Sequence, residues 1–316
     1  MQKKWRSKRK IKSALLVALF IPIMLSTVFS YQKDSGFAQL QNVNNLVKWN
    51  IYSKELIITM IDVGQGDGIF IRDPYGKTYL IDGGSSNVSS VGRFRMEPFL
   101  LSQGVREIDY VFVSHGDSDH YSGIIEMLEN QRLGVRINYL VVPKSEFHNL
   151  ELENVIEIAM KNSIPVVTFM EGQKLENYEF TILCLGPLDG FIGKGVNDYS
   201  MVLSISFRKF SMLLTGDIEE VGERALINSG KLGKHTVLKV AHHGSKTSSI
   251  QPFLEMVKPE IALISAGQNN RFNHPNSDVV ERIESLGTTI YTTKETGAVI
   301  LRTDGDRVAV SRHILK

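Results

Sequence analysis

The sequence predicts an α/β protein built as an αβ/βα sandwich, in which two mixed sheets pack together and helices cover their outer faces. Short β-branched runs and segments with helical spacing alternate along residues 51–316. Several of the runs end in Asp/Gly turns, and open α/β folds assemble their sites at such strand ends. The roughly 265 residues after the first fifty are enough for one large domain with a sizeable core.

The first half of this domain begins with strands and continues with helices. Gly and Asp-Pro turns separate three apolar segments, as expected of strands that follow one another in a sheet. The expected strands are Leu56–Ile61, Gly68–Ile71, Thr78–Ile81, Tyr110–Val113, Tyr139–Val142 and Val166–Phe169. The expected helices run from about Glu97 to Gln103, from Ile124–Leu128 onward, and over Leu152–Lys161.

The second half shows the same alternation. Its expected strands are Phe180–Leu185, Met201–Phe207, Ser211–Leu214, Val237–Ala241, Ile261–Ser265, Thr289–Tyr291, Ala298–Arg302 and Val308–Val310. Its expected helices are Glu219–Asn228, Pro252–Val257 and Ser277–Leu286. No short internal repeat and no low-complexity block interrupts this order.

The segment Ser114–His120 carries two imidazoles and two carboxylates directly after an apolar strand. Divalent ions of borderline or hard character prefer these ligands, and a loop that leaves a buried strand can turn several of them toward one point. The bland alternative is a polar turn, since Asp, Ser and Gly are common turn residues.

Other predicted strands also end in polar chemistry. Asp62 and Asp82 each follow an apolar run and are followed closely by glycines. Asp217 follows Leu213-Leu214-Thr215-Gly216, and His242-His243-Gly244-Ser245 follows Val237–Ala241. Five of the eight histidines lie at such junctions, which favours a metal site over a set of incidental surface histidines. These five are His115, His120, His242, His243 and His274.

Seven motifs in order, DVGQGDG, LIDGG, SHGDSDHYSG, NDYSMVL, LLTGD, HHGSKTSS and NRFNHP, resemble the metallo-β-lactamase superfamily. Within it, they resemble the soluble hydrolase domain of the ComEC competence-protein family. The resemblance covers about residues 56–310 and implies a metal-dependent hydrolase of the sandwich fold.

The resemblance and the spacing together suggest two ions, manganese or zinc. His115 and Asp117 would face one ion, Asp119, His120 and His243 the other, and Asp217 would bridge them. Such a pair of ions activates water and clamps a phosphoryl oxygen. If strand alternation continued, His242 would point to the opposite side from His243, which suits contact with substrate or proton transfer. The alternative is that one of the two histidines is a satisfied core residue.

Two departures from the usual superfamily pattern affect the metals. Asp117 stands where the H-x-H-x-D-H motif has its second histidine, and this harder ligand favours manganese over zinc. The usual histidine of the third segment has no clear counterpart, so Asn197 or Asp198 would either ligate or orient a water. One of the two ions is therefore expected to be weakly held.

A further group is expected to touch substrate or to support the ligands. Asp62, Gln65 and Asp82 are candidates for holding histidine tautomers. Ser245 precedes, and Lys246 begins, a helix expected to start at Lys246–Ser248, whose exposed amide groups could bind an anion. His274, like His242 and Asp217, is assigned a catalytic role. The glycine-containing loops at residues 65–68 and 83–86 either approach phosphate or are tight turns.

The amino terminus predicts a membrane anchor. Residues 1–12 carry seven basic side chains, and the uncharged stretch 13–31 is just long enough to cross a bilayer as a helix. The basic cluster favours a cytoplasmic amino terminus, so residues 51–316 are expected outside the cytoplasm after a solvated linker at 32–50. A cleaved secretory signal is the alternative, with Val28-Phe29-Ser30 as a plausible cleavage region.

Charge and cysteine content narrow the class of substrate only slightly. Without the basic cluster the chain has 29 basic and 34 acidic residues, a net charge of −5, and no long basic stripe that would indicate non-specific DNA binding. The single Cys184 cannot form an internal disulfide, so an oxidising exterior is permitted but not demonstrated.

These observations favour an extracytoplasmic, single-pass metallohydrolase. As the resemblance implies, its expected substrate is a phosphodiester, single-stranded or degraded DNA. The alternatives are a cell-envelope phosphodiesterase resembling teichoic-acid phosphorylcholine esterases, which the acidic domain favours mildly, and a non-catalytic binding partner of a separate channel.

Overall fold

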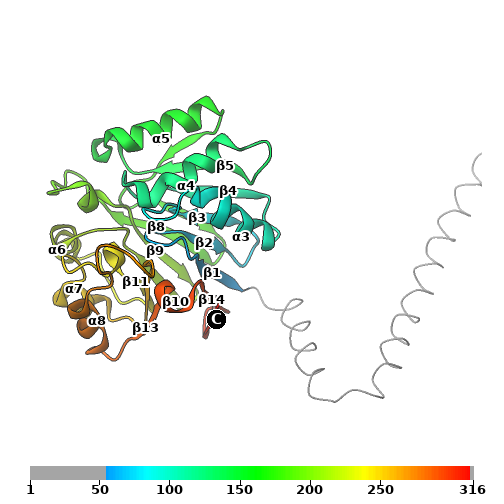
Figure 1. Cartoon of the computed structure of the whole chain (residues 1–316). Coiled ribbons are helices and arrows are strands. Elements are labelled where there is room, and N and C mark those ends of the chain that lie inside the picture. The colour runs from blue at the N-terminus through cyan, green and yellow to red at the C-terminus, as the bar shows by residue number, and fades with distance from the viewer. Residues whose placement is uncertain (1–54, 314–316) are drawn as a thin grey trace, which may run out of the picture. The chain divides into compact units, whose positions relative to one another are not determined.

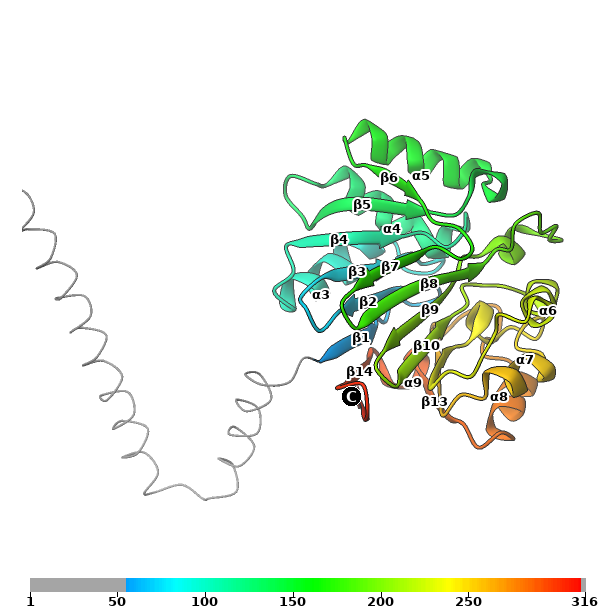
Figure 2. The same ribbon diagram turned by 180° about the vertical axis from the view of Figure 1, so that it is seen from behind.

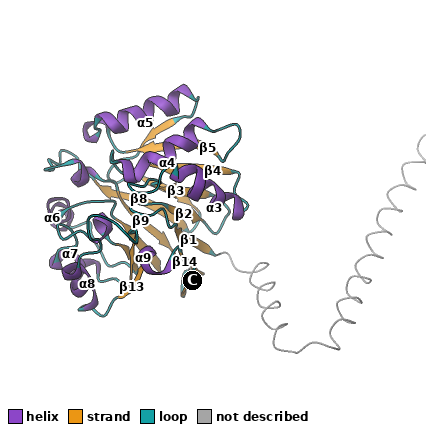
Figure 3. Cartoon of the chain, viewed as in Figure 1, coloured by secondary structure: helices purple, strands orange, loops and turns teal. Residues whose placement is uncertain are grey.

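The computed structural model describes residues 55–313, which belong to one compact unit. Two mixed sheets lie between two sets of helices (Figures 1 and 3). The predicted sandwich is thereby confirmed. The transmembrane segment expected at 13–31 lies outside the described residues, and within residues 55–313 no helix has the length and apolar character needed to cross a bilayer.

The first sheet has the strand order β15-β14-β1-β2-β3-β4-β5-β6. The pairs from β15 to β3 are antiparallel, whereas β3 to β6 are parallel and are connected by helices. Its strands are β1 Leu56–Met60, β2 Ile69–Arg72, β3 Thr78–Ile81, β4 Glu107–Phe112, β5 Arg136–Val142, β6 Val166–Thr168, β14 Val299–Thr303 and β15 Val308–Arg312.

The second sheet has the order β13-β12-β11-β10-β9-β8-β7, and β10 to β13 are parallel. Figure 2 shows its strands from behind. They are β7 Lys174–Asn177, β8 Phe180–Gly186, β9 Val202–Phe207, β10 Phe210–Leu214, β11 Val237–Lys239, β12 Ile261–Ile264 and β13 Thr289–Thr292. The short polar strand β7 was not predicted, because its sequence KLEN lacks a β-branched residue.

Helices cover both outer faces. The α-helices are α3 Glu97–Ser102, α4 Ser118–Glu129, α5 Leu150–Lys161, α6 Glu220–Ser229, α7 Gln251–Val257, α8 Ser277–Glu284 and α9 Thr293–Thr296. Short helical turns are η1 Gly92–Met96, η2 Ser145–Phe147, η3 Val196–Tyr199 and η4 Ala241–Gly244. The prediction missed α9 and began α4 six residues too late.

Three apolar clusters hold the layers together. The first lies between the sheets and includes Ile58, Phe112, Phe180 and Met212. The second packs α3, α4 and α5 on the first sheet, and the third packs α6, α7 and α8 on the second. This burial fixes both sheets rigidly, so the loops that leave their strands meet in a defined geometry.

Candidate metal centre

The metal-ligand turn follows β4 and runs directly into α4. Asp117 is the residue before the helix, so Asp119 and His120 belong to its first turn rather than to a loop. Glycines let neighbouring loops approach this turn closely. A Cβ on Gly84 would lie 2.5 Å from the backbone of Asp119, and the N–H of Asp67 donates to the Asp119 carbonyl at 3.0 Å.

Four side-chain atoms converge at one point. The Asp217 Oδ2 atom lies 3.2 Å from His120 Nε2 and 3.3 Å from His243 Nε2, and Asp119 Oδ2 lies 3.5 Å from His243 Nε2. Tetrahedral donors about 2.1 Å from a shared divalent ion lie about 3.4 Å apart. Asp119, His120 and His243 offer donor atoms within 4.8 Å of one another, and Asp217 Oδ2 contacts both histidine nitrogens. These four side chains could hold one ion, and we call them the four-donor set.

The ring nitrogens of this set show why a metal fits. The Nδ1–H of His120 donates to Asp82 Oδ2 at 2.9 Å, and the Nδ1–H of His243 donates to the Ser265 carbonyl at 3.0 Å. A carboxylate and a carbonyl can only accept a hydrogen bond, so the proton of each ring sits on Nδ1. Each Nε2 therefore carries a free lone pair. Both Nε2 atoms are buried without a hydrogen-bond partner, which is costly unless a ligand such as a metal ion completes them.

Electrostatics favour a cation at the same point. Burial lowers the pKa of His120, but the carboxylates of Asp217 and Asp82 outweigh it and hold that pKa well above its usual value. Burial raises the pKa of Asp217, yet the rings of His120 and His243 hold it well below its usual range. Because the carboxylates attract positive charge here, a divalent ion can replace the protons that the histidines would otherwise bind.

Two residues of the centre were missed by the sequence prediction. Asp67 is fully buried and its Oδ1 lies 3.4 Å from His243 Nδ1. Lys239, also fully buried, forms an ion pair with Asp67, lies 3.6 Å from Asp217 Oδ1, and donates to the Gly216 carbonyl at 3.0 Å. A lysine inside the apolar run Val237–Ala241 was the available signal, since an unpaired charge is very rarely buried.

The ammonium of Lys239 remains charged in this position. Burial lowers the pKa of Lys239, but Asp67 and Asp217 outweigh it and raise that pKa above its usual value. Burial raises the pKa of Asp67, and the Lys239 and His243 charges lower it to about 2. The two groups therefore form a charged pair in the floor of the centre.

A second set of ligands is less complete. His115 Nε2 is buried and unpartnered, and His115, His120 and Asp217 offer donor atoms within 4.8 Å of one another. Asp117 Oδ2 lies 3.7 Å from His115 Nε2, but 44 % of its side chain is exposed. Asp117 therefore lies at the exposed side of this second set, whose other members are buried.

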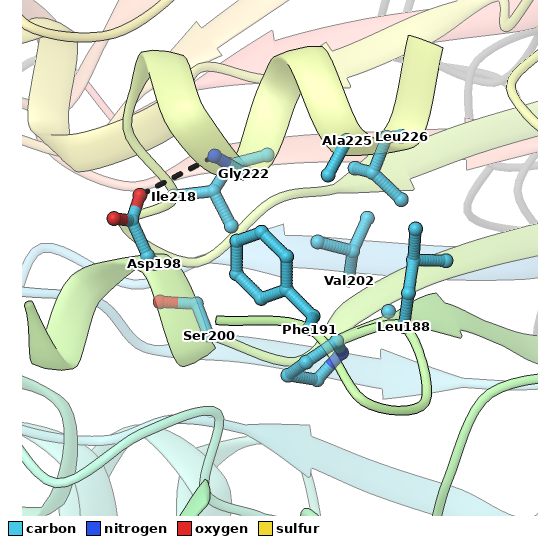
Figure 4. Close-up of a pocket in the computed structure, with 11 residues that line it drawn as sticks. Leu188, Phe191, Asp198, Ser200, Val202, Ile218, Gly222, Ala225 and Leu226 are labelled. Carbon is cyan, nitrogen blue, oxygen red and sulfur yellow. Dashed lines mark hydrogen bonds between the residues drawn. The ribbon is translucent and has the colours of Figure 1, made fainter. Parts of the chain in front are cut away.

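Asp198 is not part of either set, so of the two roles predicted for it, metal ligand or support for a bound water, the ligand role finds no support. Its carboxylate accepts from the N–H groups of Lys194 at 2.8 Å and Gly222 at 3.3 Å. Figure 4 shows it at the edge of a mainly apolar pocket beneath α6. Asn197 lies beside it in η3, and its carbonyl accepts from Ser200, whose Oγ in turn accepts from the N–H of Asp217 at 3.0 Å. This segment therefore positions Asp217.

The double histidine does not continue a strand. β11 ends at Lys239, and both His242 and His243 adopt positive φ angles, 49° and 54°. The expectation that strand alternation places His242 on the opposite side was therefore wrong. His242 Nε2 lies 3.9 Å from Asp217 Oδ2, and its Nδ1 lies 3.2 Å from Glu219 Oε1. With 23 % of its side chain exposed, His242 lies at the rim while His243 is buried.

His274 and Gln65 meet beside the centre. The His274 ring stacks on that of His243, and Gln65 Nε2 lies 3.5 Å from His274 Nδ1. Burial and the rings of His243 and His242 lower the pKa of His274 to about 4, so it is neutral at neutral pH. Asp62, which was expected to support a histidine, instead pairs with Arg95 at 3.4 Å.

The predicted phosphate contacts find less support. No helix begins at Lys246–Ser248, since α7 starts at Gln251 and Ser245 Oγ bonds to Thr247 Oγ1 at 2.9 Å. Lys246 is exposed in the loop before it. The Gly83 and Gly84 amides donate to the carbonyls of His120 and Asp67, so these glycines hold the protein backbone together. These two amides are therefore not free to bind phosphate, and the residues 82–85 do not form a tight turn either.

Comparison with known proteins agrees with this geometry. The model of the metallo-beta-lactamase superfamily matches residues 61–268. ComE operon protein 3 of Bacillus subtilis is 30 % identical over 263 residues, which cover 79 % of this chain and 33 % of that protein. Recombination protein 2 of Haemophilus influenzae is 30 % identical over 256 residues, 81 % of this chain and 30 % of that protein.

Solved structures show the same fold. The metallo-beta-lactamase fold protein YhfI from Bacillus subtilis matches with a TM-score of 0.52 and 13 % identity, over 77 % of this chain and 98 % of that one. This chain spans about a third of the length of the curated relatives it matches. Sequence and fold agree, and the chain belongs to the metallo-beta-lactamase superfamily, with ComEC-like competence proteins among its relatives.

Proposed function

We propose that this metal-dependent hydrolase is a phosphodiesterase that acts on single-stranded or degraded DNA outside the cytoplasm. The observation that carries the proposal is the four-donor set, whose two buried Nε2 atoms are aimed at one point without a partner. A divalent ion bound there polarises a phosphoryl oxygen and lowers the pKa of water. Asp119, His120, Asp217 and His243 would hold it.

The remaining side chains support hydrolysis around that point. Asp82 and the Ser265 carbonyl keep the two histidine rings in the tautomer with a free Nε2. His242 lies at the rim, with Nε2 toward Asp217 and Nδ1 toward Glu219, so Nε2 is placed to move a proton at the leaving oxygen. His274 is neutral and can hydrogen-bond substrate without repelling the ion.

The substrate class rests on chemistry and on the relatives. The competence relatives favour DNA, and the exposed Lys246 offers a charge for phosphate. The net charge of −5 outside the basic cluster argues for short or single-stranded pieces rather than long duplexes. A small envelope phosphodiester is the alternative that the same charge favours.

An assay with two substrates separates these functions. Full-length protein in detergent is incubated with manganese or zinc and, in parallel, with single-stranded DNA or bis-p-nitrophenyl phosphate. Asp217→Asn serves as the inactive variant, and Asp304→Asn, in a turn at the surface, serves as its control. We expect cleavage of both substrates by the wild type and the control. Cleavage of the small ester alone would favour the envelope enzyme, and no cleavage of either would favour the non-catalytic binding partner.

The location is a separate part of the proposal. The seven basic residues of 1–12 and the uncharged stretch 13–31 support a single-pass anchor with the domain outside. A reporter enzyme that works only outside the cytoplasm should be active when it is fused after Lys316. Activity of a reporter that works only inside would contradict this orientation.

A further inference from the structure

We infer that Phe272 and Arg271 form a binding site for one nucleobase and its phosphate at the rim of the metal centre. The inference rests on the DNA substrate proposed above and names the part of that substrate which the site holds. Both residues precede His274 in the NRFNHP segment, and the proposed function uses neither of them.

The place of the Phe272 ring is the first argument. It stacks on the His274 ring, with the centroids 5.6 Å apart and the planes 23° from parallel. The His274 ring stacks in turn on that of His243, a member of the four-donor set, at 6.2 Å. These rings form a chain of contacts from the buried centre to the surface, where 47 % of Phe272 is exposed. A base stacked on Phe272 would therefore belong to a nucleotide close to the phosphate at the centre.

The loop that carries the ring is held in one shape. The side chain of Asn270 donates to the carbonyls of Gly267 and His274, each at 2.8 Å, and accepts from the His274 N–H at 2.8 Å. The N–H of Asn276 donates to the Gly244 carbonyl at 2.9 Å, which joins this loop to the double-histidine loop. A platform that is already fixed loses little conformational freedom when a base stacks on it.

The charge beside the ring favours a nucleotide. The Arg271 guanidinium lies 4.9 Å from the centroid of the Phe272 ring, and Arg271 is exposed. An aromatic ring that stacks a base next to a cation that contacts phosphate is typical of single-strand binding. Lys246, exposed on the adjoining double-histidine loop, adds a second cation. A choline group also binds aromatic rings, but the positive charge of Arg271 would repel it.

Phe94 provides a matched control for these properties. It is 63 % exposed, and the guanidinium of Arg93 lies 5.5 Å from the centroid of its ring. It belongs to η1, however, and not to the rim that His242 and His274 form. Exposure and a neighbouring arginine are thus common to both phenylalanines, whereas the stack on His274 belongs to Phe272.

The first experiment detects stacking directly and needs no turnover. The two tryptophans of the chain, Trp5 and Trp49, precede residues 55–313, so Phe272→Trp adds a fluorescent ring at the proposed site. Full-length protein in detergent is loaded with Zn²⁺. A thymidine oligonucleotide should quench the fluorescence that Phe272→Trp adds to the wild-type signal, and an abasic strand of equal length should not. Phe94→Trp should be quenched by neither strand.

Three results of this experiment would overturn the inference. They are no quenching of Phe272→Trp by the thymidine strand, equal quenching by the abasic strand, and equal quenching of Phe94→Trp.

Kinetics measures the strength of the contact. Phe272→Ala should raise KM for the thymidine oligonucleotide roughly 5- to 150-fold and change kcat little, in line with the usual strength of base stacking. Phe272→Trp should restore KM, and Phe94→Ala should behave as wild type. A wild-type KM in Phe272→Ala, or an equal rise in KM for the abasic strand, would overturn the inference.

The inference and the proposed function can fail separately. If the wild type cleaves no DNA but the thymidine strand quenches Phe272→Trp, the nuclease proposal fails and the binding site stands. If DNA is cleaved with a KM that does not depend on Phe272, the nuclease stands and the binding site fails. If the thymidine strand does not quench Phe272→Trp, and p-nitrophenyl phosphorylcholine is cleaved with a KM that depends on Phe272, the ring binds choline and the inference is overturned.

Discussion

Replacing Asp82 by Asn tests whether the centre depends on the tautomer of His120. Asp82 is 2 % exposed, its Oδ2 accepts from His120 Nδ1 at 2.9 Å, and its Oδ1 accepts from the Ser114 N–H at 2.7 Å. Asn keeps the shape and tolerates the φ of 59° at this position. If its oxygen stays on Ser114, its amide group faces Nδ1, and the ring proton moves to Nε2, the atom that would bind the metal.

The expected effect is a loss of metal affinity. Changing such an outer partner typically costs 10- to 100-fold in affinity, which is about 1.4–2.8 kcal/mol. Mn²⁺ or Zn²⁺ affinity is measured by competition with a chelating dye. Asp73→Asn is the matched control, because Asp73 is equally buried and holds a turn away from the centre. Wild-type affinity in folded Asp82→Asn, or an equal loss in Asp73→Asn, would refute the reasoning.

Three other changes probe the centre and its scaffold. Gly84→Ala should reduce both thermal stability and metal binding, because the new Cβ would meet the Asp119 backbone at 2.5 Å; unchanged binding would count against the close approach. Cys184 is fully buried, and burial raises the pKa of its thiol to about 12, so iodoacetamide should label it only after unfolding; labelling of native protein would contradict its placement. Burial raises the pKa of Glu223 from 4.5 to about 7, so its ionisation weakens the fold as pH rises between those values. The unfolding free energy of Glu223→Gln relative to wild type should therefore gain about 3 kcal/mol between pH 4 and pH 8, and a constant difference would contradict the shift.

Most of the fold was predictable because its strands have a clear sequence pattern. Largely buried apolar runs such as those of β3 and β10 are followed by Asp/Gly segments that the sequence displays. The ligand motif at His115–His120 was visible for the same reason. The start of α4 was misplaced because Ser118–Ser122 is polar and shows no apolar spacing, although it forms the first turn of the helix.

The contacts inside the centre were harder to predict. Asp67 follows β1 of the first sheet and Lys239 ends β11 of the second, so their pairing depends on how two sheets meet and not on any local pattern. His242 was misplaced because its side-chain direction follows from a positive φ, which periodicity does not reveal for a non-glycine residue. The role of Asp198 stayed open because a buried aspartate that accepts from backbone N–H groups has the same sequence signature as a ligand.

The position of bound metal tests the central claim most directly. A crystal of the protein grown with Mn²⁺ would be measured at an X-ray energy where manganese scatters anomalously. We expect a strong anomalous peak within ligand distance of Asp119 Oδ2, His120 Nε2, Asp217 Oδ2 and His243 Nε2. The absence of a peak at that point would contradict the account.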